Sequence, residues 1–482
     1  MQLNSKARTF SQLATALLLG SSLVGCAAVV KTPYQAPAVE IPSQFEQQRL
    51  SSQQIHSQLN TDRWWTLFND AALNQLVEQV LAQNSDLAVA GLNLQQARLQ
   101  AKQSQSQQGV RIGTAGISTG HQISLDGDGD RTRGISLNYP GLSYELDLFG
   151  KLANQTEAAR WEALATEQDL QATAQGLIAT TANLYWQLGY LNEHLTVAQQ
   201  NLASTEKTYQ LVNAQYRAGA VSGLDLTQAE QALQSQKATL SQIAQQKVAT
   251  RTALAVLLHQ PVQMLNIAEP KRLGAISLPK IHAGLPAELL SRRPDLNAAE
   301  LRLRKALANK DANKASYYPS ISLTGTLSTG VGTGAHTSLS DALKNPIATL
   351  GAGLTLPFLQ WNDMQRDLKV NALEYEKAIV QYRQTLYQAF ADVENALSAR
   401  SELDRQVNLQ MQNLLLAEKT ERLTEVRYRH GAIALKNLLD AQATTRNARL
   451  NLLQTKQNQY NAYVTLLQAL GGSPLQQLPQ QP

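Results

Sequence analysis

The sequence predicts a mostly α-helical protein, internally duplicated, with two pairs of β-strands that cross a lipid bilayer. Three observations support this fold class. Residues 358–430 contain no glycine or proline, so 73 consecutive residues can form a single helix. Similar motifs recur 209 and 212 positions apart. Two stretches also alternate apolar with small or polar residues, which is the two-residue period of a strand.

The N-terminus has the organisation of a secretory signal. Lys6 and Arg8 precede a short apolar run, and the small residues after it lead to Leu23-Val24-Gly25-Cys26. A charged, an apolar and a small-residue region in this order form a cleavable signal that is too short to span a membrane permanently. The last four residues resemble the bacterial lipobox, in which a signal peptidase cuts before a lipidated cysteine. Cys26 is the only cysteine of the chain, so it cannot form an internal disulfide, and we expect it to carry lipid.

Two long segments repeat one plan. Residues 216–221 match residues 428–433 at an offset of 212, and Asp86-Leu87 matches Asp295-Leu296 at an offset of 209. This period is too long for a solenoid, so we interpret the chain as an internal duplication. The predicted organisation is a signal peptide at 1–25, an N-terminal segment at 26–70, a first repeat at 71–258, a linker at 259–284, a second repeat at 285–470 and a tail at 471–482.

We expect the first repeat to contain, in this order, a helix, a pair of strands, a long helix, a turn and a second helix. We expect one helix from about Ala71 to Gln108, a strand pair over 110–148 and a long helix that ends at a turn near Gly219. A helix that ends in a left-handed residue favours glycine at this place. Gly176 and Gly189 interrupt the long helix, so it should bend or break sooner than its counterpart in the second repeat.

The second repeat follows the same order more clearly. Pro294 suits the first turn of a helix, where its missing N–H costs nothing. A strand pair follows over 319–358, and the glycine-free helix then ends at a turn at Gly431. Its apolar residues follow the alternating four-three spacing of a seam packed along another helix. They are Tyr375, Ile379, Tyr382, Leu386, Ala389, Val393 and Ala396.

The strands suit a membrane rather than a soluble sheet. Period-two runs of about ten residues fit strands that cross a bilayer obliquely, with one face toward lipid and the other toward a polar lumen. Four strands cannot close a membrane barrel, and open sheet edges are not tolerated in lipid. The barrel must therefore be assembled from several chains. Strand counting alone allows eight strands from a dimer or twelve from a trimer.

The sequence gives no sign of catalysis. The seven histidines lack metal-ligand spacing, and one cysteine cannot build a cysteine-based metal site. The acidic run 126–130 resembles the start of a calcium loop but continues with Arg131 and Leu137 instead of glycine and glutamate. Residues 330–334 lack the lysine of a phosphate loop. We expect no metal, no cofactor, no enzymatic activity and, without a dense Lys/Arg tract, no nucleic-acid partner.

Several motifs together resemble the outer membrane factor family, the TolC-like channels. They are the lipobox, residues 144–151 (YELDLFGK), residues 292–296 (RRPDL), residues 319–325 (PSISLTG) and the two Tyr-Arg-x-Gly-Ala turns. The chain looks most similar to the lipoprotein branch that serves resistance-nodulation-division drug pumps. The resemblance implies a homotrimer with a twelve-stranded β-barrel in the outer membrane, continued by a long α-helical barrel in the periplasm. Ala27, where inner-membrane lipoproteins generally have aspartate, implies export to the outer membrane.

The resemblance also implies site residues. In the family, acidic residues just past the second turn ring the periplasmic entrance and hold it closed until partner proteins engage. The residues of this chain that correspond to such a gate are Asp440, Asn437 and Lys436, with Asp225 after the first turn. Lys436 departs from the apolar residue common in this branch. The helix tips that would contact a periplasmic adaptor carry Gly219, Gly431, Arg217 and Arg429.

We therefore expect a passive trimeric duct, the outer-membrane component of a tripartite efflux pump that exports drugs and other small molecules. Its expected partners are further copies of the chain, a periplasmic adaptor, an inner-membrane pump and outer-membrane lipid. Two alternatives remain open at this point. A type I secretion duct shares the architecture, although lipidation is less typical of it. A structural tether would link the outer membrane to the periplasm without conducting solutes.

Overall fold

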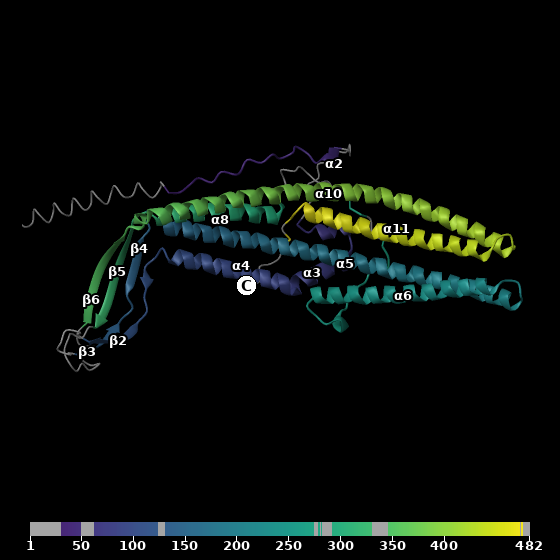
Figure 1. Cartoon of the computed structure of the whole chain (residues 1–482), viewed down its shortest axis with the longest axis horizontal. Helices are drawn as coiled ribbons and strands as arrows, with labels where there is room; N and C mark the ends of the chain where they lie inside the picture. The colour runs from purple at the N-terminus through teal and green to yellow at the C-terminus, as the bar shows by residue number, and fades with distance from the viewer. Residues whose placement is uncertain are drawn as a thin grey trace, which may run out of the picture. The chain divides into compact units, whose positions relative to one another are not determined.

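The computed structural model describes residues 30–49, 62–123, 131–273, 278–279, 281, 292–329, 346–472 and 474–475 (Figure 1). Cys26, the acidic run 126–130 and residues 330–334 lie outside the described residues. The chain forms two compact units. The first unit takes the residues up to Val39, Asn93–Glu167 and Ala298–Arg383, and the second takes Glu40–Leu92, Gln168–Asn297 and the residues from Gln384 onward.

The described elements repeat one order. After the short helices α2 (Glu46–Arg49) and η2 (Trp64–Phe68), the first repeat contains α3 (Ala71–Gln83), α4 (Ser85–Ser106), β1 (Arg111–Ile112), β2 (Gly116–Ile123), β3 (Arg131–Asn138), β4 (Leu142–Leu146), α5 (Lys151–Arg217) and α6 (Gly223–Leu257). After η3 (Val262–Met264), the second repeat contains α8 (Pro294–Ser316), β5 (Ser320–Thr329), β6 (Pro346–Thr355), η5 (Pro357–Leu359), α10 (Trp361–Arg429) and α11 (Leu435–Ala469). Mostly helical structure with a small antiparallel sheet was expected and is confirmed.

The two longest helices are nearly equal in length. Helix α10 has 69 residues, as its freedom from glycine and proline predicted, and α5 has 67. α5 was predicted to bend or break at its glycines, and it does not break, because the helix is continuous. Gly189 allows a close approach instead. A Cβ added there would lie 3.2 Å from Leu273 Cδ2 and 3.3 Å from Pro270 Cγ, so the missing side chain makes room for the following linker.

The single helix predicted over 71–108 is divided at Asn84, which corrects that prediction. The backbone of Asn84 is extended, with φ −68° and ψ 129°. Its Oδ1 accepts hydrogen bonds from the N–H groups of Asp86 (2.9 Å) and Leu87 (3.1 Å), and its Nδ2 donates to the carbonyl of Leu257 (2.9 Å). The side chain therefore caps α4 and ties the break to the end of α6.

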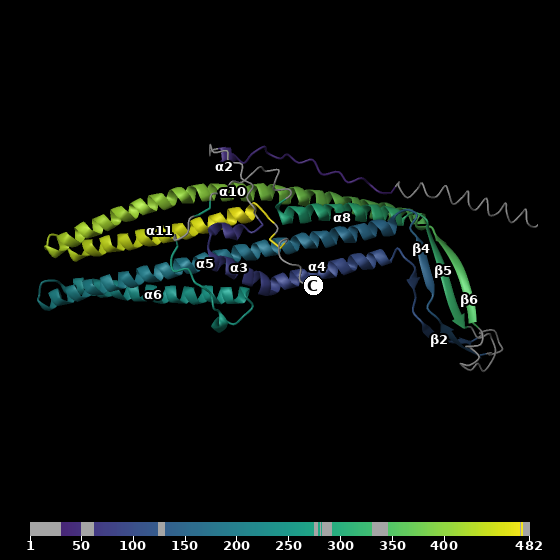
Figure 2. The same cartoon turned by 180° about the vertical axis from the view of Figure 1, so that it is seen from behind.

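The helix seam predicted in α10 is buried over most of its length. Tyr375 and Ile379 are half-buried, and the next five seam residues, from Tyr382 to Ala396, are buried. Leu386, Ala389 and Val393 have no exposed surface. In the second unit, α10 lies beside α11, and α5 lies beside α6, so each pair forms a helical hairpin (Figures 1 and 2).

The sheet lies in the first unit and is an antiparallel meander. β1 pairs with β4, β2 pairs with β3, both β3 and β4 pair with β5, and β5 pairs with β6. β3 and β4 follow one line with a bend at Tyr139–Gly141, where the Tyr139 N–H still donates to Leu327 O (2.9 Å). β1 and β2 therefore share one strand position, and β3 and β4 share the next, so the sheet is four strands wide. Among the described residues, the outer edges of β1/β2 and of β6 have no partner strand.

An extended N-terminal strap, residues 31–38, packs on the helices of the first unit. The N–H and hydroxyl of Thr32 both donate to the buried carboxylate of Asp311, at 2.7 and 2.8 Å. The Tyr34 ring lies 4.5 Å from the Arg304 guanidinium, which is also 5.2 Å from the Trp161 ring. Burial and nearby Glu300 raise the pKa of Tyr34 to about 12, so its hydroxyl stays protonated and donates to Glu300.

Aromatic residues fill the core of the second unit. Trp64, Trp65 and Phe68 of η2 are buried, and Phe68 lies 5.5 Å from the ring of Trp186 in α5. Trp186 in turn lies 4.6 Å from Tyr460 of α11. This aromatic cluster joins the N-terminal segment to one helix of each hairpin.

Candidate functional site

Both helical hairpins turn at a glycine in the left-handed conformation. Gly219 has φ +74° and Gly431 has φ +70°. At the first tip, the Ala220 N–H donates to Gln215 O (2.8 Å) and the Gly219 N–H donates to Tyr216 O (2.9 Å). The second tip repeats both bonds at 2.9 Å. These paired bonds form a Schellman motif, which satisfies the last carbonyls of a helix and requires a residue that tolerates positive φ.

The two tips pack against each other through an apolar cluster within the second unit. Its buried members come from all four hairpin helices and are Val212, Ala229, Tyr428, Leu435 and Leu438. The hydroxyl of Tyr428 donates to Gln215 Oε1 at 2.8 Å, which adds a polar link between α10 and α5. The tips are therefore one packed structure within the chain.

The first tip contains a capping box that sequence reasoning overlooked. Ser222 Oγ accepts from the Asp225 N–H (3.3 Å), and Asp225 Oδ2 accepts from the N–H of Ser222 (3.0 Å) and from its hydroxyl (2.6 Å). These donated hydrogen bonds lower the pKa of Asp225. The described bonds of Asp225 thus hold the start of α6, and they do not reach Lys436, Asn437 or Asp440. The Ser-x-x-Asp pattern was the available signal.

The other three predicted gate residues lie on one exposed face of α11, opposite the buried Leu435 and Leu438. The structure brings Lys436 and Asp440 together, with Nζ 2.6 Å from Oδ2 and most of both side chains exposed. Asn437 is exposed and occupies the third helical position, where α6 has Asp225. The second tip has no side-chain cap, because Ala434 stands at the N-cap.

The tip arginines stay on the surface. Arg217 is exposed at the last position of α5, and Arg429 pairs with Glu425 one turn earlier in α10 at 2.6 Å. Positive side chains in the last turn interact favourably with the helix dipole. Both tips therefore offer exposed positive charge beside the turn glycines.

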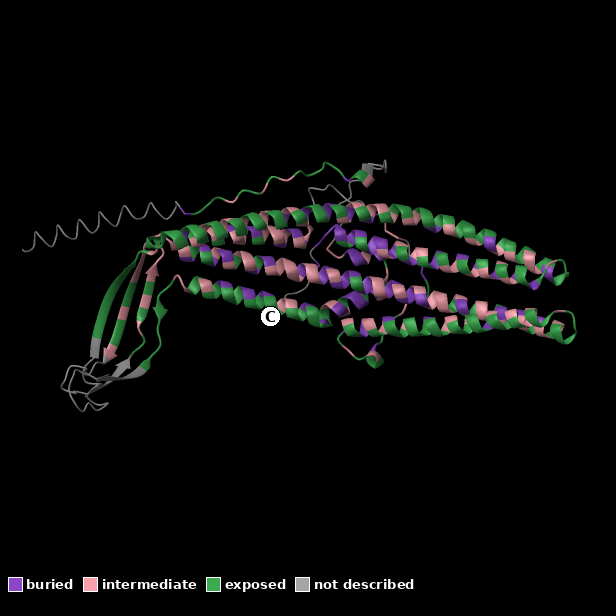
Figure 3. Ribbon diagram, in the orientation of Figure 1, coloured by how far each residue is buried: buried purple, intermediate pink, exposed green. Residues whose placement is uncertain are grey.

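Strands β4, β5 and β6 separate their apolar and polar side chains onto opposite faces. Cross-strand partners match in character: Leu146 lies opposite Ile321 and Ile321 lies opposite Leu354, whereas Ser143 lies opposite Thr324. The large apolar residues exposed on this sheet are Ile112, Leu142, Tyr144, Leu323, Leu327, Leu350 and Leu354. Leu350 exposes 91% of its surface, and residues 348–355 of β6 are all exposed among the described residues (Figure 3).

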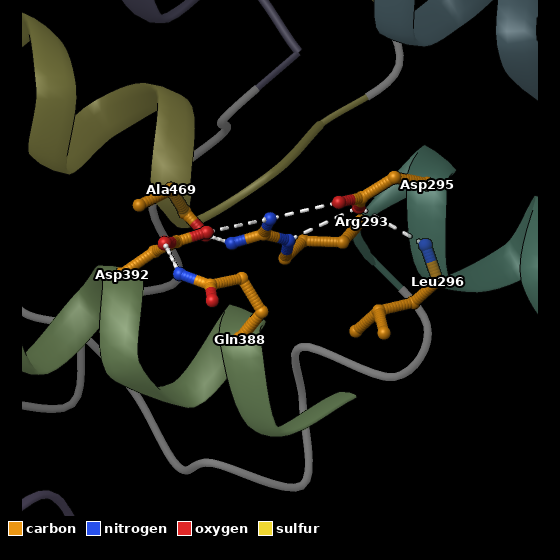
Figure 4. Close-up of polar contacts among 6 residues, drawn as sticks. All are labelled: Arg293, Asp295, Leu296, Gln388, Asp392 and Ala469. Carbon is orange, nitrogen blue, oxygen red and sulfur yellow. Dashed lines mark hydrogen bonds and ion pairs between the residues drawn. The ribbon is translucent and has the colours of Figure 1, made fainter. Parts of the chain in front are cut away.

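A charged network in the second unit was missed by sequence reasoning. The guanidinium of Arg293 is largely buried and makes two bonds to Asp295 (2.8 and 3.1 Å), one to Asp392 of α10 (3.1 Å) and one to the carbonyl of Ala469 in α11 (3.3 Å), as Figure 4 shows. Gln388 donates to the other oxygen of Asp392 (2.8 Å). Burial opposes the charge of Arg293, but the two carboxylates outweigh it and raise its pKa.

A cavity of about 500 Å³ opens beside this network. Its lining mixes the charged groups of the network with small residues of α10 and α11. The guanidinium of Arg293 is hydrogen-bonded to both carboxylates and to the carbonyl of Ala469, so the network fastens the start of α8 to α10 and α11. Arg293 was visible in the sequence only as part of a motif, because its partners other than Asp295 lie 99 and 176 residues away.

The described residues contain no group of three histidine, cysteine, aspartate or glutamate side chains that could hold a metal ion. His194 in α5 is the most enclosed of the described histidines, and burial lowers its pKa. A separate finding is that none of the described helices is long and apolar enough to cross a membrane.

Comparison with known proteins gives the family. The model of the outer membrane efflux protein family matches twice, over residues 76–259 and 285–472. The chain belongs to the outer membrane efflux protein family. The two matches of the family model follow the repeated order of elements, since each contains a strand pair, a long helix and a tip.

Relatives of this outer membrane efflux protein align along almost its whole length. The antibiotic efflux pump outer membrane protein ArpC of Pseudomonas putida is 32% identical over 473 residues, covering 95% of this chain and 94% of ArpC. The cation efflux system protein CusC of Escherichia coli is 28% identical, covering 94% and 96%. The solved open state of the MtrE outer membrane channel of Neisseria gonorrhoeae gives a TM-score of 0.79 at 29% identity, covering 92% of this chain and 98% of that one.

Proposed function

We propose that three copies of this chain form a passive duct, the outer-membrane component of a tripartite efflux pump. The observation that carries the proposal is the sheet, which has one exposed apolar face and two open edges. Such a sheet is stable in lipid only when other strands complete it, because unpaired backbone groups cost several kcal/mol each in hydrocarbon. Pairing β6 of one copy with β1/β2 of the next would close a twelve-stranded barrel.

The helices support the same assembly. Helix α10 has a second apolar stripe outside its buried seam, formed by Val370, Leu373, Val380 and Tyr387, which are all exposed. Their spacing of three or seven residues is that of one helix face. An exposed stripe of this kind is covered when a helix of a neighbouring copy packs along it. Three copies would then extend the barrel as a helical tunnel.

For the entrance, we propose that the exposed face of α11 lines the narrow end of this tunnel. Lys436, Asn437 and Asp440 lie together on that face, and Asp225 contributes from the first tip. Asp440 would supply negative charge, Asn437 would supply donors and acceptors to a neighbouring copy, and Lys436 would compensate Asp440. Opening would separate these contacts between copies.

The tips are the proposed contact for a periplasmic adaptor, which links the duct to an inner-membrane pump. Gly219 and Gly431 fix the turns, and Arg217 and Arg429 give them positive charge. Lipid on Cys26 is proposed as a second attachment to the outer membrane, beside the barrel. The exported compounds follow from the pump rather than the duct: relatives are named for antibiotics and for cations, although their chains align over similar lengths.

The experiment that tests the duct is conductance of the purified protein in planar lipid bilayers, with a matched pair of variants. Leu350→Arg places a charge on the apolar face of β6, and Thr349→Arg places the same charge on its polar face. In a membrane strand the first change costs about 2–4 kcal/mol at the bilayer centre, whereas the second faces water. We expect Leu350→Arg to abolish channels and Thr349→Arg to keep them with altered ion preference.

Two outcomes would contradict the duct. If wild-type protein inserts into vesicles but never conducts, even after removal of charge at the tip, the chain is a tether. If both arginine variants lose insertion equally, the two faces of β6 do not differ in environment.

A further inference from the structure

The turn between β6 and α10 exposes large apolar side chains in an unusual concentration. Phe358 exposes 41%, Leu359 74% and Trp361 61% of its surface. They lie on η5 and at the first position of α10, within four consecutive residues. We call Phe358, Leu359 and Trp361 the apolar turn. Single exposed apolar residues are common, but a contiguous group indicates a surface that is covered in use.

Two neighbours show what kind of environment the apolar turn borders. On one side lies β6, whose Leu350 and Leu354 belong to the exposed apolar face of the sheet. On the other side the surface becomes charged at once: Asp363 and Arg366 are exposed and paired at 3.3 Å. Trp361 and Arg366 are separated by only about 8 Å of helix. An abrupt change from aliphatic to aromatic to charged side chains is typical of the boundary between acyl chains and water.

The first repeat has no such turn. Phe149, which corresponds to Phe358, stacks on Tyr318 with ring centroids 4.8 Å apart. At the positions that match Leu359 and Trp361 the first repeat has Gly150 and Leu152, and Leu152 is buried. The polar groups around this connection are paired: Lys151 with Glu145 (3.1 Å), and Asp147 with the N–H groups of Leu152 and Ala153. The apolar turn is therefore not a requirement of joining a strand to a long helix, since the same connection is made without it.

We propose that the apolar turn enters the lipid bilayer at the boundary between headgroups and acyl chains and so fixes the depth at which the sheet sits. Trp361 lies at the headgroup level, Leu359 and Phe358 lie toward the acyl chains, and Arg366 faces the lipid phosphates. The partner is phospholipid, in continuity with the apolar sheet face. The inference rests on the proposed membrane duct, because it requires the sheet to lie in lipid.

The test is fluorescence quenching of the full-length protein in vesicles whose phospholipids carry bromine either near the headgroup or near the chain end. Trp64, Trp65 and Trp186 are buried in the second unit and Trp161 is half-buried, so the difference between wild type and Trp361→Phe reports Trp361. We expect Trp361 to lose about half of its emission with bromine near the headgroup and much less with bromine near the chain end. Gln360→Ser, within the same turn, should leave this pattern unchanged.

A second probe separates this proposal from the proposed function. Leu350→Trp in the Trp361→Phe background reports the middle of β6. If this probe is quenched by bromine at the chain end while Trp361 is not quenched by either lipid, the sheet lies in the membrane and the apolar turn does not. That result overturns the inference about the apolar turn and leaves the proposed duct standing. If aqueous iodide also fails to quench Trp361, a neighbouring copy of the chain covers this side chain. If neither probe is quenched, the membrane sheet itself is overturned.

Discussion

At the scale of single residues, Lys436 stands where helix energetics do not favour it. It occupies the first turn of α11, where the helix dipole opposes positive charge. Its partner Asp440 follows four residues later, an orientation less favourable than acid before base. An exposed pair of this kind contributes about 0.3–0.5 kcal/mol, so fold stability does not explain it. Lys436 instead compensates the negative charge of Asp440, because its Nζ lies 2.6 Å from Oδ2 of that carboxylate.

This gives the first prediction. Lys436→Ala should uncover the charge of Asp440 and raise the preference for cations over anions, and Asp440→Ala should lower it. The double variant should return close to wild type. The measurement is the reversal potential of single channels under a salt gradient. If neither single variant shifts the reversal potential, both residues are ordinary surface charges.

The second prediction concerns Arg293. Arg293→Met should destabilise the protein by roughly 2 kcal/mol, because it leaves Asp295 and Asp392 without their shared cation. The estimate is below that for a fully buried pair, since both carboxylates are partly exposed. Arg293→Lys is the matched control: it keeps the charge but not the two-pronged bond to Asp295, so it should recover only part of the loss. Denaturant unfolding measures both, and equal stability of all three proteins would refute the role.

At the scale of elements, the two tips share turns but differ in their caps. Ser222 (φ −81°, ψ 163°) and Ala434 (φ −74°, ψ 156°) have almost the same backbone, yet only Ser222 caps its helix. The first turn of α11 therefore leaves backbone N–H groups without a side-chain acceptor. It should open more easily than the first turn of α6.

The third prediction follows from this difference. Ala434→Ser with Asn437→Asp should create the missing capping box and stabilise the start of α11 by about 1 kcal/mol, and Ser222→Ala should cost α6 a similar amount. Amide hydrogen exchange should slow at residues 435–438 in the first case and speed up at 223–226 in the second. Unchanged exchange at both tips would show that the cluster of packed side chains alone holds them.

The capping box also carries a pH dependence. The pKa of Asp225 is lowered in the folded chain by the groups of Ser222 that donate to it. Its contribution to stability is therefore complete above the unfolded value of about 3.9 and is lost as the pH falls through the lower folded value. The stability difference between wild type and Ser222→Ala should shrink below pH 4 accordingly.

The sequence predicted the extent and the ends of those elements that depend on nearby residues, above all on glycine and proline. Absence of glycine and proline predicted the extent of α10, and glycine in the tip motif predicted both turns. The break at Asn84 was missed because the asparagine acts through distant contacts, including the carbonyl of Leu257. Of the bend or break expected in α5, the break does not occur, because tertiary packing outweighs the roughly 1 kcal/mol cost of a helical glycine. At the candidate site, Asp440 and Lys436 were predicted by resemblance, and their role as a gate stays a prediction. The contacts of Arg293 with Asp392 and Ala469 join residues too far apart in sequence to be predicted from it.

The fourth prediction tests the seam of α10. Ala389→Pro should prevent assembly, because proline removes a helix hydrogen bond and clashes with the preceding turn at a residue with no exposed surface, at a cost of about 3 kcal/mol or more. Ala389→Gly is the milder control, at about 1 kcal/mol, and should assemble with lowered stability. Light scattering of detergent-extracted protein measures the result. A proline variant that assembles like wild type would place the seam outside the structural core.

At the scale of the whole molecule, the proposed assembly predicts a mass. Detergent-extracted protein should behave as a homotrimer of about three times the mature chain, measured by light scattering coupled to size-exclusion chromatography. A stable single copy with an intact sheet would contradict the proposal. A dimer would instead correspond to the eight-stranded closure that strand counting also allows.

The two open edges of the sheet have a consequence for what stability means in this protein. A strand meander that ends at β1/β2 on one side and at β6 on the other holds its last hydrogen bonds only through other molecules. The free energy of the sheet is then a function of how many copies share the same patch of membrane. Diluting the protein in lipid should melt the strands before it melts the helical hairpins, because the seam of α10 and the tip cluster are buried within one chain. The number of copies in the membrane would thus decide whether the sheet is folded, as temperature or denaturant does for an ordinary domain.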